Sequence, residues 1–122
     1  MGEVSILWIA LGLFVAAMFA GVALARFHWR AKMPPWTLTA LHGLFAAGGV
    51  VTLIIAAAPL TSLGRLQLIL GLFLLTALGG VGVLSFHIRK RNPPKTLILA
   101  HASGAVTAFI VLLLYTLGFI SP

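Results

Sequence analysis

Apolar residues run almost without interruption through four segments of the chain, and polar residues collect between them. These segments cover about 4–28, 36–58, 63–87 and 95–118. Each is close to the roughly 20 residues that an α-helix needs to cross the hydrocarbon layer of a bilayer. A helix satisfies its backbone N–H and C=O groups internally, as lipid requires. The pattern therefore predicts an all-α membrane protein, a single domain over residues 1–122 with four transmembrane helices.

The composition supports this interpretation. Of the 122 residues, 61% are hydrophobic and 7% are charged, whereas a soluble domain contains about 25% charged residues. The first apolar segment follows no basic stretch and is longer than the roughly 7–15 apolar residues of a signal peptide. We therefore expect it to remain as a helix. The chain has no cysteine, which excludes disulfides, thiolate metal sites and iron–sulfur clusters.

The net charge of +7 is distributed unevenly along the chain. All Lys and Arg residues except Arg65 lie in or beside the first connection, at 26–32, or the third, at 89–95. Because short loops rich in Lys and Arg stay in the cytoplasm, we expect these connections to be cytoplasmic and both termini to lie outside. The pattern favours the bacterial inner (cytoplasmic) membrane, where these cations contact anionic lipid headgroups. A nucleic-acid partner is not expected.

The second half of the chain repeats the first when the sequence is shifted by 59 positions. Matched positions include Gly21 with Gly80, His28 with His87, Arg30 with Arg89, Pro34-Pro35 with Pro93-Pro94, and His42 with His101. Each unit, about 4–58 or 63–118, holds two crossings, so the units share one orientation and are related by a pseudo-two-fold axis along the membrane normal. We expect an up-down-up-down four-helix bundle. In it, helices one and three face across one diagonal, and helices two and four across the other.

Prolines and hydroxyl residues indicate where the helices begin and end. Each Pro-Pro pair is expected to start the helix that follows it, because proline is tolerated in the first turn. Pro59 is expected to end the second helix, and Thr61 or Ser62 to cap the third. The many glycines and alanines within the spans allow membrane helices to approach closely.

All four histidines belong to the repeat. His28 and His87 end helices one and three, whereas His42 and His101 lie six residues beyond the expected starts of helices two and four, a depth of about 9 Å. An ionisable side chain at such depth usually faces the bundle interior and has a partner there. The spans contain no Asp or Glu, so a carboxylate–histidine proton relay and a carboxylate-rich metal site are excluded.

Two histidines at equal depth on symmetry-related helices suit a haem b whose iron takes one axial imidazole from each helix. We expect His42 and His101 to be these ligands. Small residues near the two histidines, several of them four or seven positions later on the same helix face, leave room for the porphyrin. The residues expected to line the cofactor in this way are Gly43, Ala46, Gly49 and Ala105.

The other histidines suggest how many haems bind. If the propionates point towards the cytoplasm, they approach His28 and His87, and Arg30 and Arg89 follow two residues later to pair with these carboxylates. This one-haem arrangement is favoured. The alternative holds two haems, with His28 paired to His101 and His87 paired to His42.

With histidines on four helices (His28, His42, His87 and His101) and glycines near them, the chain resembles the small four-helix bis-histidine membrane b-type cytochromes. The likeness is one of class, without a specific sequence signature. It implies electron transfer, with quinone and a redox partner protein as expected partners. Many such cytochromes carry haem near both membrane faces, whereas here every histidine lies near one face. Electron transfer across the membrane by this chain alone is therefore not expected.

Two other functions remain open. One is a histidine-dependent proton or metal-ion channel or transporter, although a depth difference of about 5 Å between the two histidine pairs disfavours a compact four-imidazole site. The other is a pigment-binding or structural subunit of a larger respiratory or photosynthetic complex. A hydrolase is not expected, and any enzymatic role would be that of a component of a quinone-linked oxidoreductase.

Overall fold

The computed structural model describes residues 2–60 and 63–120, and this part of the chain is all-helical, without strands. The helices are α1 (Glu3–Trp29), α2 (Trp36–Ala57), α3 (Arg65–Ile88) and α4 (Lys95–Thr116). Each is long and apolar enough to cross a membrane. The predicted all-α fold with four helices of membrane-spanning length is thus confirmed.

The outer surface of the bundle is apolar. Phe19 is 76% exposed, Leu78 68% and Leu75 67%, and large exposed hydrophobic side chains occur on all four helices. A soluble protein rarely exposes so much contiguous apolar surface. The four helices are therefore compatible with a multi-pass membrane protein whose outer face contacts lipid.

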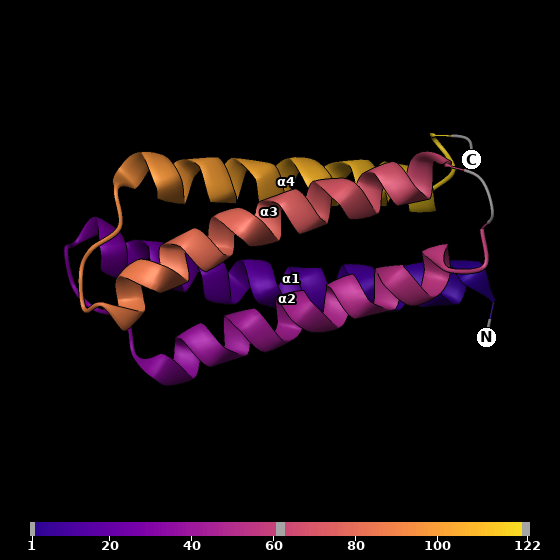
Figure 1. Cartoon of the computed structure of the whole chain (residues 1–122). Helices are drawn as coiled ribbons and strands as arrows, with labels where there is room; N and C mark the ends of the chain where they lie inside the picture. Colours follow the sequence, from indigo (N-terminus) through magenta and orange to yellow (C-terminus); the bar gives the residue numbers. More distant parts are fainter. Residues whose placement is uncertain (1, 61–62, 121–122) are drawn as a thin grey trace.

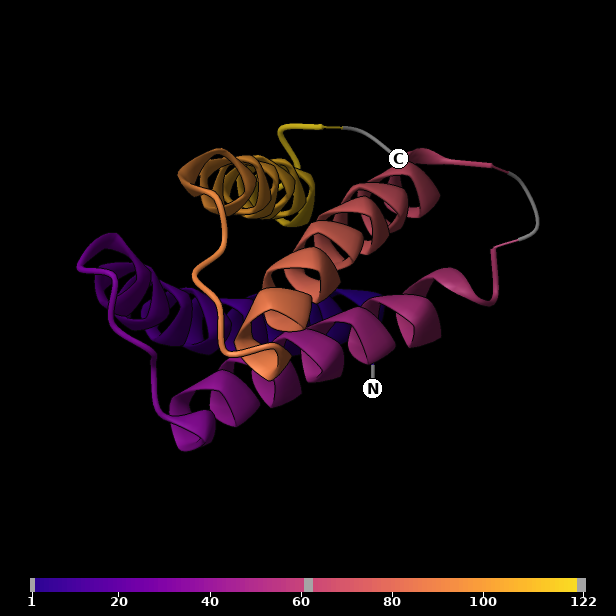
Figure 2. The same ribbon diagram turned by 60° about the vertical axis from the view of Figure 1, so that its left-hand side comes forward.

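Two helical hairpins lie one over the other, α1 with α2 and α3 with α4 (Figures 1 and 2). Between the hairpins, α1 contacts α4 and α2 contacts α3. The connections 30–35 and 89–94 lie at one end of the bundle, and the described ends of the chain lie at the other (Figure 1). The diagonal pairs meet through side chains: Phe14 of α1 stacks on Phe73 of α3, with ring centroids 4.0 Å apart.

The first helix of each hairpin ends in the same backbone motif. Ala31 and Lys90 adopt positive φ angles of 52° and 54°. The residue after each donates a backbone hydrogen bond to the carbonyl five residues earlier. These bonds run from Lys32 N–H to the Phe27 carbonyl and from Arg91 N–H to the Phe86 carbonyl, each 2.9 Å. This left-handed cap satisfies carbonyls that the helix end leaves free. Both chain reversals therefore use the conformation that normally favours glycine.

The helices that follow begin as the proline pairs predict. Pro35 and Pro94 are the N-cap residues of α2 and α4, with ψ angles of 144° and 139°. Their partners Pro34 and Pro93 are buried. At the start of α3 the N-cap is Gly64, whose backbone N–H donates to Oε1 of Gln67 at 2.9 Å. Thr61 and Ser62, the expected caps, lie outside the described residues.

The hydrophobic core occupies the half of the bundle nearest the termini. Its members come from the first half of α1, the last part of α2, the first half of α3 and the last part of α4: Leu7, Ala10, Leu11, Phe14, Leu53, Ala56, Ala57, Leu66, Ile69, Phe73, Ala108 and Leu112. In the half nearest the basic connections, the buried polar residues are two histidines, His28 and His87. The two halves of the bundle therefore differ in kind, one tightly packed and apolar, the other rich in histidine.

The positive φ angle of Ala31 can be tested by substitution with glycine. A non-glycine residue in this conformation carries a steric cost that glycine avoids. We expect Ala31→Gly to raise the free energy of unfolding by about 0.5–1 kcal/mol, measured by denaturant titration in detergent with circular dichroism. The control Ala25→Gly, within α1, should lower it by about 1 kcal/mol. A loss of stability in Ala31→Gly equal to that of the control would contradict the positive φ angle.

Candidate functional site

The imidazole rings of His42 and His101 face each other across the bundle. Their centroids are 6.1 Å apart, and the ring planes are inclined at 81°. His42 comes from α2 and His101 from α4, so each hairpin contributes one ring. Both side chains are only partly buried. The structure thus brings together the two histidines that the sequence places at equal depth.

Each of these rings is held by the same hydrogen bond. Nδ1 of His42 lies 2.8 Å from the carbonyl oxygen of Ala17, and Nδ1 of His101 lies 2.9 Å from that of Thr76. A carbonyl oxygen only accepts, so Nδ1 carries the proton and donates it. In the neutral ring Nε2 then keeps its lone pair. This bond at the second nitrogen is the one that orients most metal-ligating histidines in proteins.

Glycines on the neighbouring helices make room for these rings. A Cβ atom at Gly21 would lie 3.1 Å from Cε1 of His42, and one at Gly80 would lie 2.9 Å from Cε1 of His101. Gly21 follows Ala17 by four residues and Gly80 follows Thr76 by four, so each glycine lies one turn beyond the accepting carbonyl on the same helix face. A side chain at Gly80 would therefore displace the His101 ring, and one at Gly21 would crowd the His42 ring.

His87, near the end of α3, is also held in place, and its contacts come from the other hairpin. Its ring lies 4.0 Å from the ring of Trp36, and its Nδ1 is 3.2 Å from the hydroxyl oxygen of Thr39. Both partners belong to the first turns of α2. His87 is 5% exposed, so these contacts supply a buried imidazole with an aromatic neighbour and a hydrogen bond.

His28 is equally buried, at 7% exposure, but its Nδ1 has no hydrogen-bond partner in the described part of the chain. The repeat explains the difference. The position that matches Thr39 is Ile98, which is buried and has no hydroxyl group. Lys95 replaces Trp36, and its ammonium lies 4.8 Å from the centroid of the Trp29 ring. A buried polar atom without a partner costs about 1–3 kcal/mol, so the His28 ring is suited to receive a partner from outside the chain.

The remaining residues expected to line a cofactor have varied surroundings. A Cβ atom at Gly49 would lie 2.6 Å from the Phe14 ring, so this ring already fills the space beside that glycine. Gly43 is exposed, and a Cβ atom there would meet no atom within 4 Å. Ala46 and Ala105 are half-buried. Their contact with a cofactor stays a prediction.

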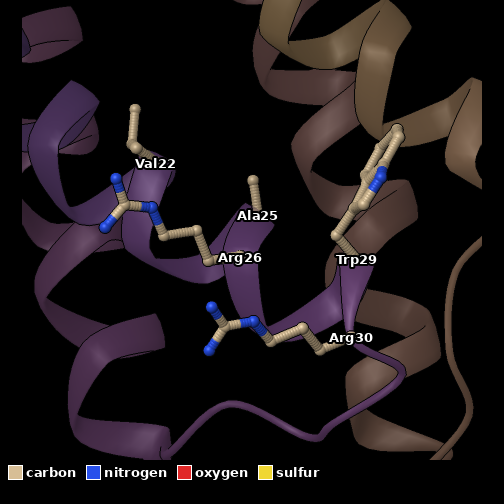
Figure 3. Close-up of a pocket in the computed structure, with 5 residues that line it drawn as sticks. All are labelled: Val22, Ala25, Arg26, Trp29 and Arg30. Carbon is tan, nitrogen blue, oxygen red and sulfur yellow. The ribbon is translucent and has the colours of Figure 1, made fainter.

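The two arginines expected to pair with propionates lie on the surface. Nε of Arg89 donates to the carbonyl oxygen of Ser85 and its terminal nitrogen to the Ser85 hydroxyl, each at 3.0 Å. Its guanidinium also lies 5.0 Å from the Phe86 ring centroid. Arg30 lines a shallow surface pocket with Arg26, Val22, Ala25 and Trp29 (Figure 3). Both guanidiniums are exposed, and their pairing with propionates stays a prediction.

A second shallow pocket opens between α3 and α4 and reaches His101. Its polar lining consists of His101 and three hydroxyl residues, Thr76, Ser103 and Thr107. The first hairpin has Leu44 and Gly48 where the second has Ser103 and Thr107. The polar lining is therefore a property of the second hairpin and leads from the outer surface of the bundle to one histidine of the pair.

Among the described residues, no three or more His, Cys, Asp or Glu side chains lie close enough to share a metal ion. The histidine arrangement therefore offers two facing imidazoles rather than a compact cluster of four.

Several residues of this site carry little signal in the sequence. The carbonyls of Ala17 and Thr76 have none, because every residue has one. Gly21 and Gly80 had a usable signal, since both halves have glycine at the same position. Thr39 could not be identified from the pattern, because its match Ile98 is apolar.

Comparison of the chain with models of known protein families, with curated proteins and with solved structures found no match.

The close approach of His101 to the main chain predicts a sharp response to one added methyl group. In Gly80→Ala the new Cβ atom displaces the imidazole, and overpacking of this kind costs about 1–3 kcal/mol. Gly71→Ala is the matched control on the same helix, because a Cβ atom there meets no atom within 4 Å. We expect Gly71→Ala to leave the free energy of unfolding in detergent level or to raise it, and Gly80→Ala to have a value about 1–3 kcal/mol below that of Gly71→Ala. Equal effects of both variants would contradict the described ring position.

Proposed function

We propose that this protein binds one haem b between His42 and His101 and transfers electrons at the membrane. The observation that carries the proposal is the facing pair of imidazoles, each held through Nδ1 so that Nε2 keeps its lone pair. A metal bound between two imidazoles, with bonds of about 2 Å, separates the ring centres by roughly 6 Å. The 6.1 Å between the two centroids fits this requirement.

The packing of the bundle also supports a cofactor at this level. The hydrophobic core fills the half nearest the termini, whereas the half with the histidines has half-buried side chains around His42 and His101. Gly21 and Gly80 let the two rings lie against the main chain of the neighbouring helices. The looser packing of this half suits a flat macrocycle. Bound haem would supply one-electron redox chemistry, and the chain would bind, orient and shield it.

The contacts favour one haem rather than two. In the two-haem alternative His42 pairs with His87, and His101 with His28. His87, however, already has Trp36 and Thr39 as neighbours, whereas His42 and His101 face each other. His28 then has a separate use. Its buried Nδ1 lacks a partner, and we assign it to a haem propionate, because a hydrogen bond to a carboxylate is stronger than one to a neutral acceptor.

The second pocket suggests how a quinone could exchange electrons with such a haem. A quinone is lipophilic and carries carbonyl oxygens that accept hydrogen bonds. The pocket between α3 and α4 opens on the lipid-facing surface, offers the hydroxyls of Ser103 and Thr107, and ends at His101. Since two i, i+4 hydroxyls lie on one helix face, a quinone ring in this pocket would lie beside an iron ligand.

The packed half of the bundle makes electron exchange one-sided. The stack of Phe14 on Phe73 and the surrounding aliphatic residues lie between the histidines and the terminal end. We therefore propose that a redox partner protein approaches at the basic connections, 30–35 and 89–94. By the positive-inside rule these connections lie in the cytoplasm. Both termini then lie on the opposite, non-cytoplasmic side of the bacterial inner membrane.

Optical spectra of histidine variants test the proposal. We expect purified wild-type protein in detergent, reduced with dithionite, to show a sharp α-band of six-coordinate haem b. His42→Ala and His101→Ala each remove one axial ligand, so each should lose this band. His28→Ala should keep the band, because it removes only the proposed propionate contact.

Two results would contradict the proposal. The first is a colourless wild-type protein after expression with ample haem. The second is an α-band that survives in both His42→Ala and His101→Ala, which would move the ligands elsewhere. Equal loss of haem in His28→Ala and His42→Ala, from a wild type with two haems per chain, would instead select the two-haem arrangement.

A further inference from the structure

Two arginines lie side by side at the end of α1. Arg26 and Arg30 are four residues apart, both are exposed, and their side chains extend to the same side of the helix, whereas Trp29 points to the other side (Figure 3). Neither guanidinium has a hydrogen bond or ion pair to the described residues. Like charges four residues apart on a helix repel each other, so an anion between them would relieve this repulsion.

The chain itself offers no such anion. Its only acidic residue is Glu3, at the opposite end of α1. The corresponding place in the second hairpin is arranged differently, because Ser85 takes the place of Arg26. There Arg89 donates to both the hydroxyl and the carbonyl oxygen of Ser85. One half of the repeat thus satisfies its arginine internally, whereas the other half presents two free guanidiniums.

An apolar stripe leads to the two arginines. Val15, Phe19 and Val22 are spaced four and three residues apart, so they lie on one face of α1 that continues to Arg26. All three are exposed, Phe19 most of all. A ligand that fits this surface has an anionic head for the guanidiniums and an apolar tail for the stripe. Guanidinium groups bind phosphate particularly well, because two N–H groups can donate to two oxygens.

We propose that Arg26 and Arg30 form a specific site for the phosphate of an anionic phospholipid, with an acyl chain along Val15, Phe19 and Val22. The lipid belongs to the leaflet next to the basic connections. The site does not depend on haem. It gives Arg30 a lipid phosphate as its partner in place of the haem propionate expected from the sequence. The second hairpin lacks the site because Ser85 occupies the position of the first arginine.

Native mass spectrometry of the full-length protein tests this assignment. Detergent micelles are supplied with equal amounts of phosphatidylglycerol and phosphatidylcholine that have identical acyl chains. We expect wild-type protein to retain phosphatidylglycerol preferentially. Arg26→Ser recreates the Ser85–Arg89 pair in the first hairpin and removes one cation, so it should lower this preference about fivefold. Arg26→Lys keeps the charge but loses the paired N–H donors, so its preference should lie between those of Arg26→Ser and the wild type.

The second hairpin provides the gain-of-function arm. Ser85→Arg places two arginines at the end of α3, beside the exposed apolar residues Leu74, Leu78 and Val81, and should add a second retained phosphatidylglycerol. This variant leaves α1 intact, so it keeps the test decisive if Arg26→Ser fails to fold.

An unchanged lipid preference in folded Arg26→Ser, or no additional lipid in Ser85→Arg, would overturn the site. Displacement of phosphatidylglycerol by millimolar inorganic phosphate would also overturn it, because the site would then bind a free anion rather than a lipid.

Discussion

The candidate site depends on one kind of interaction, the hydrogen bond from an imidazole Nδ1 to a main-chain carbonyl of the neighbouring helix. Ala17 and Thr76 provide these carbonyls, and a glycine one turn later provides the space. The bond selects the tautomer and the orientation of each ring. It also leaves Nε2 of each neutral ring unprotonated, as a metal ligand must be. Without it, two histidines at equal depth would be interfacial polar side chains.

The two hairpins share a backbone plan but differ in the side chains that complete it. The left-handed helix ends, the proline starts and the His–carbonyl bonds occur in both halves. The differences concern polar partners: Nδ1 of His87 has the Thr39 hydroxyl, whereas Nδ1 of the matching His28 has no hydrogen-bond partner among the described residues. Similarly, Ser85 satisfies Arg89, while the first hairpin has a second arginine there. His28 and the Arg26–Arg30 pair of the first half therefore lack the partners that their counterparts His87 and Arg89 have.

Much of the fold could be predicted from the sequence because membrane helices are specified by the length of their apolar segments and by proline at their starts. The depth of His42 and His101 followed from their distance to those prolines. Helix rotation decides the rest, and these helices are apolar on every face, so no polar side marks the interior. The position of the Phe14 ring, stacked on Phe73 and beside Gly49, and the contact of His87 with Thr39 therefore emerged only from the three-dimensional structure.

Titration of haem-free protein with haemin tests the central claim most directly, because it counts the binding sites of the intact chain. In detergent, the absorbance of bound haem should rise to a breakpoint at one equivalent per chain and show a low-spin, six-coordinate ferric spectrum. A breakpoint at two equivalents would contradict the single site between His42 and His101. Absorbance that rises without a breakpoint, as for haem dissolved in micelles alone, would contradict haem binding altogether.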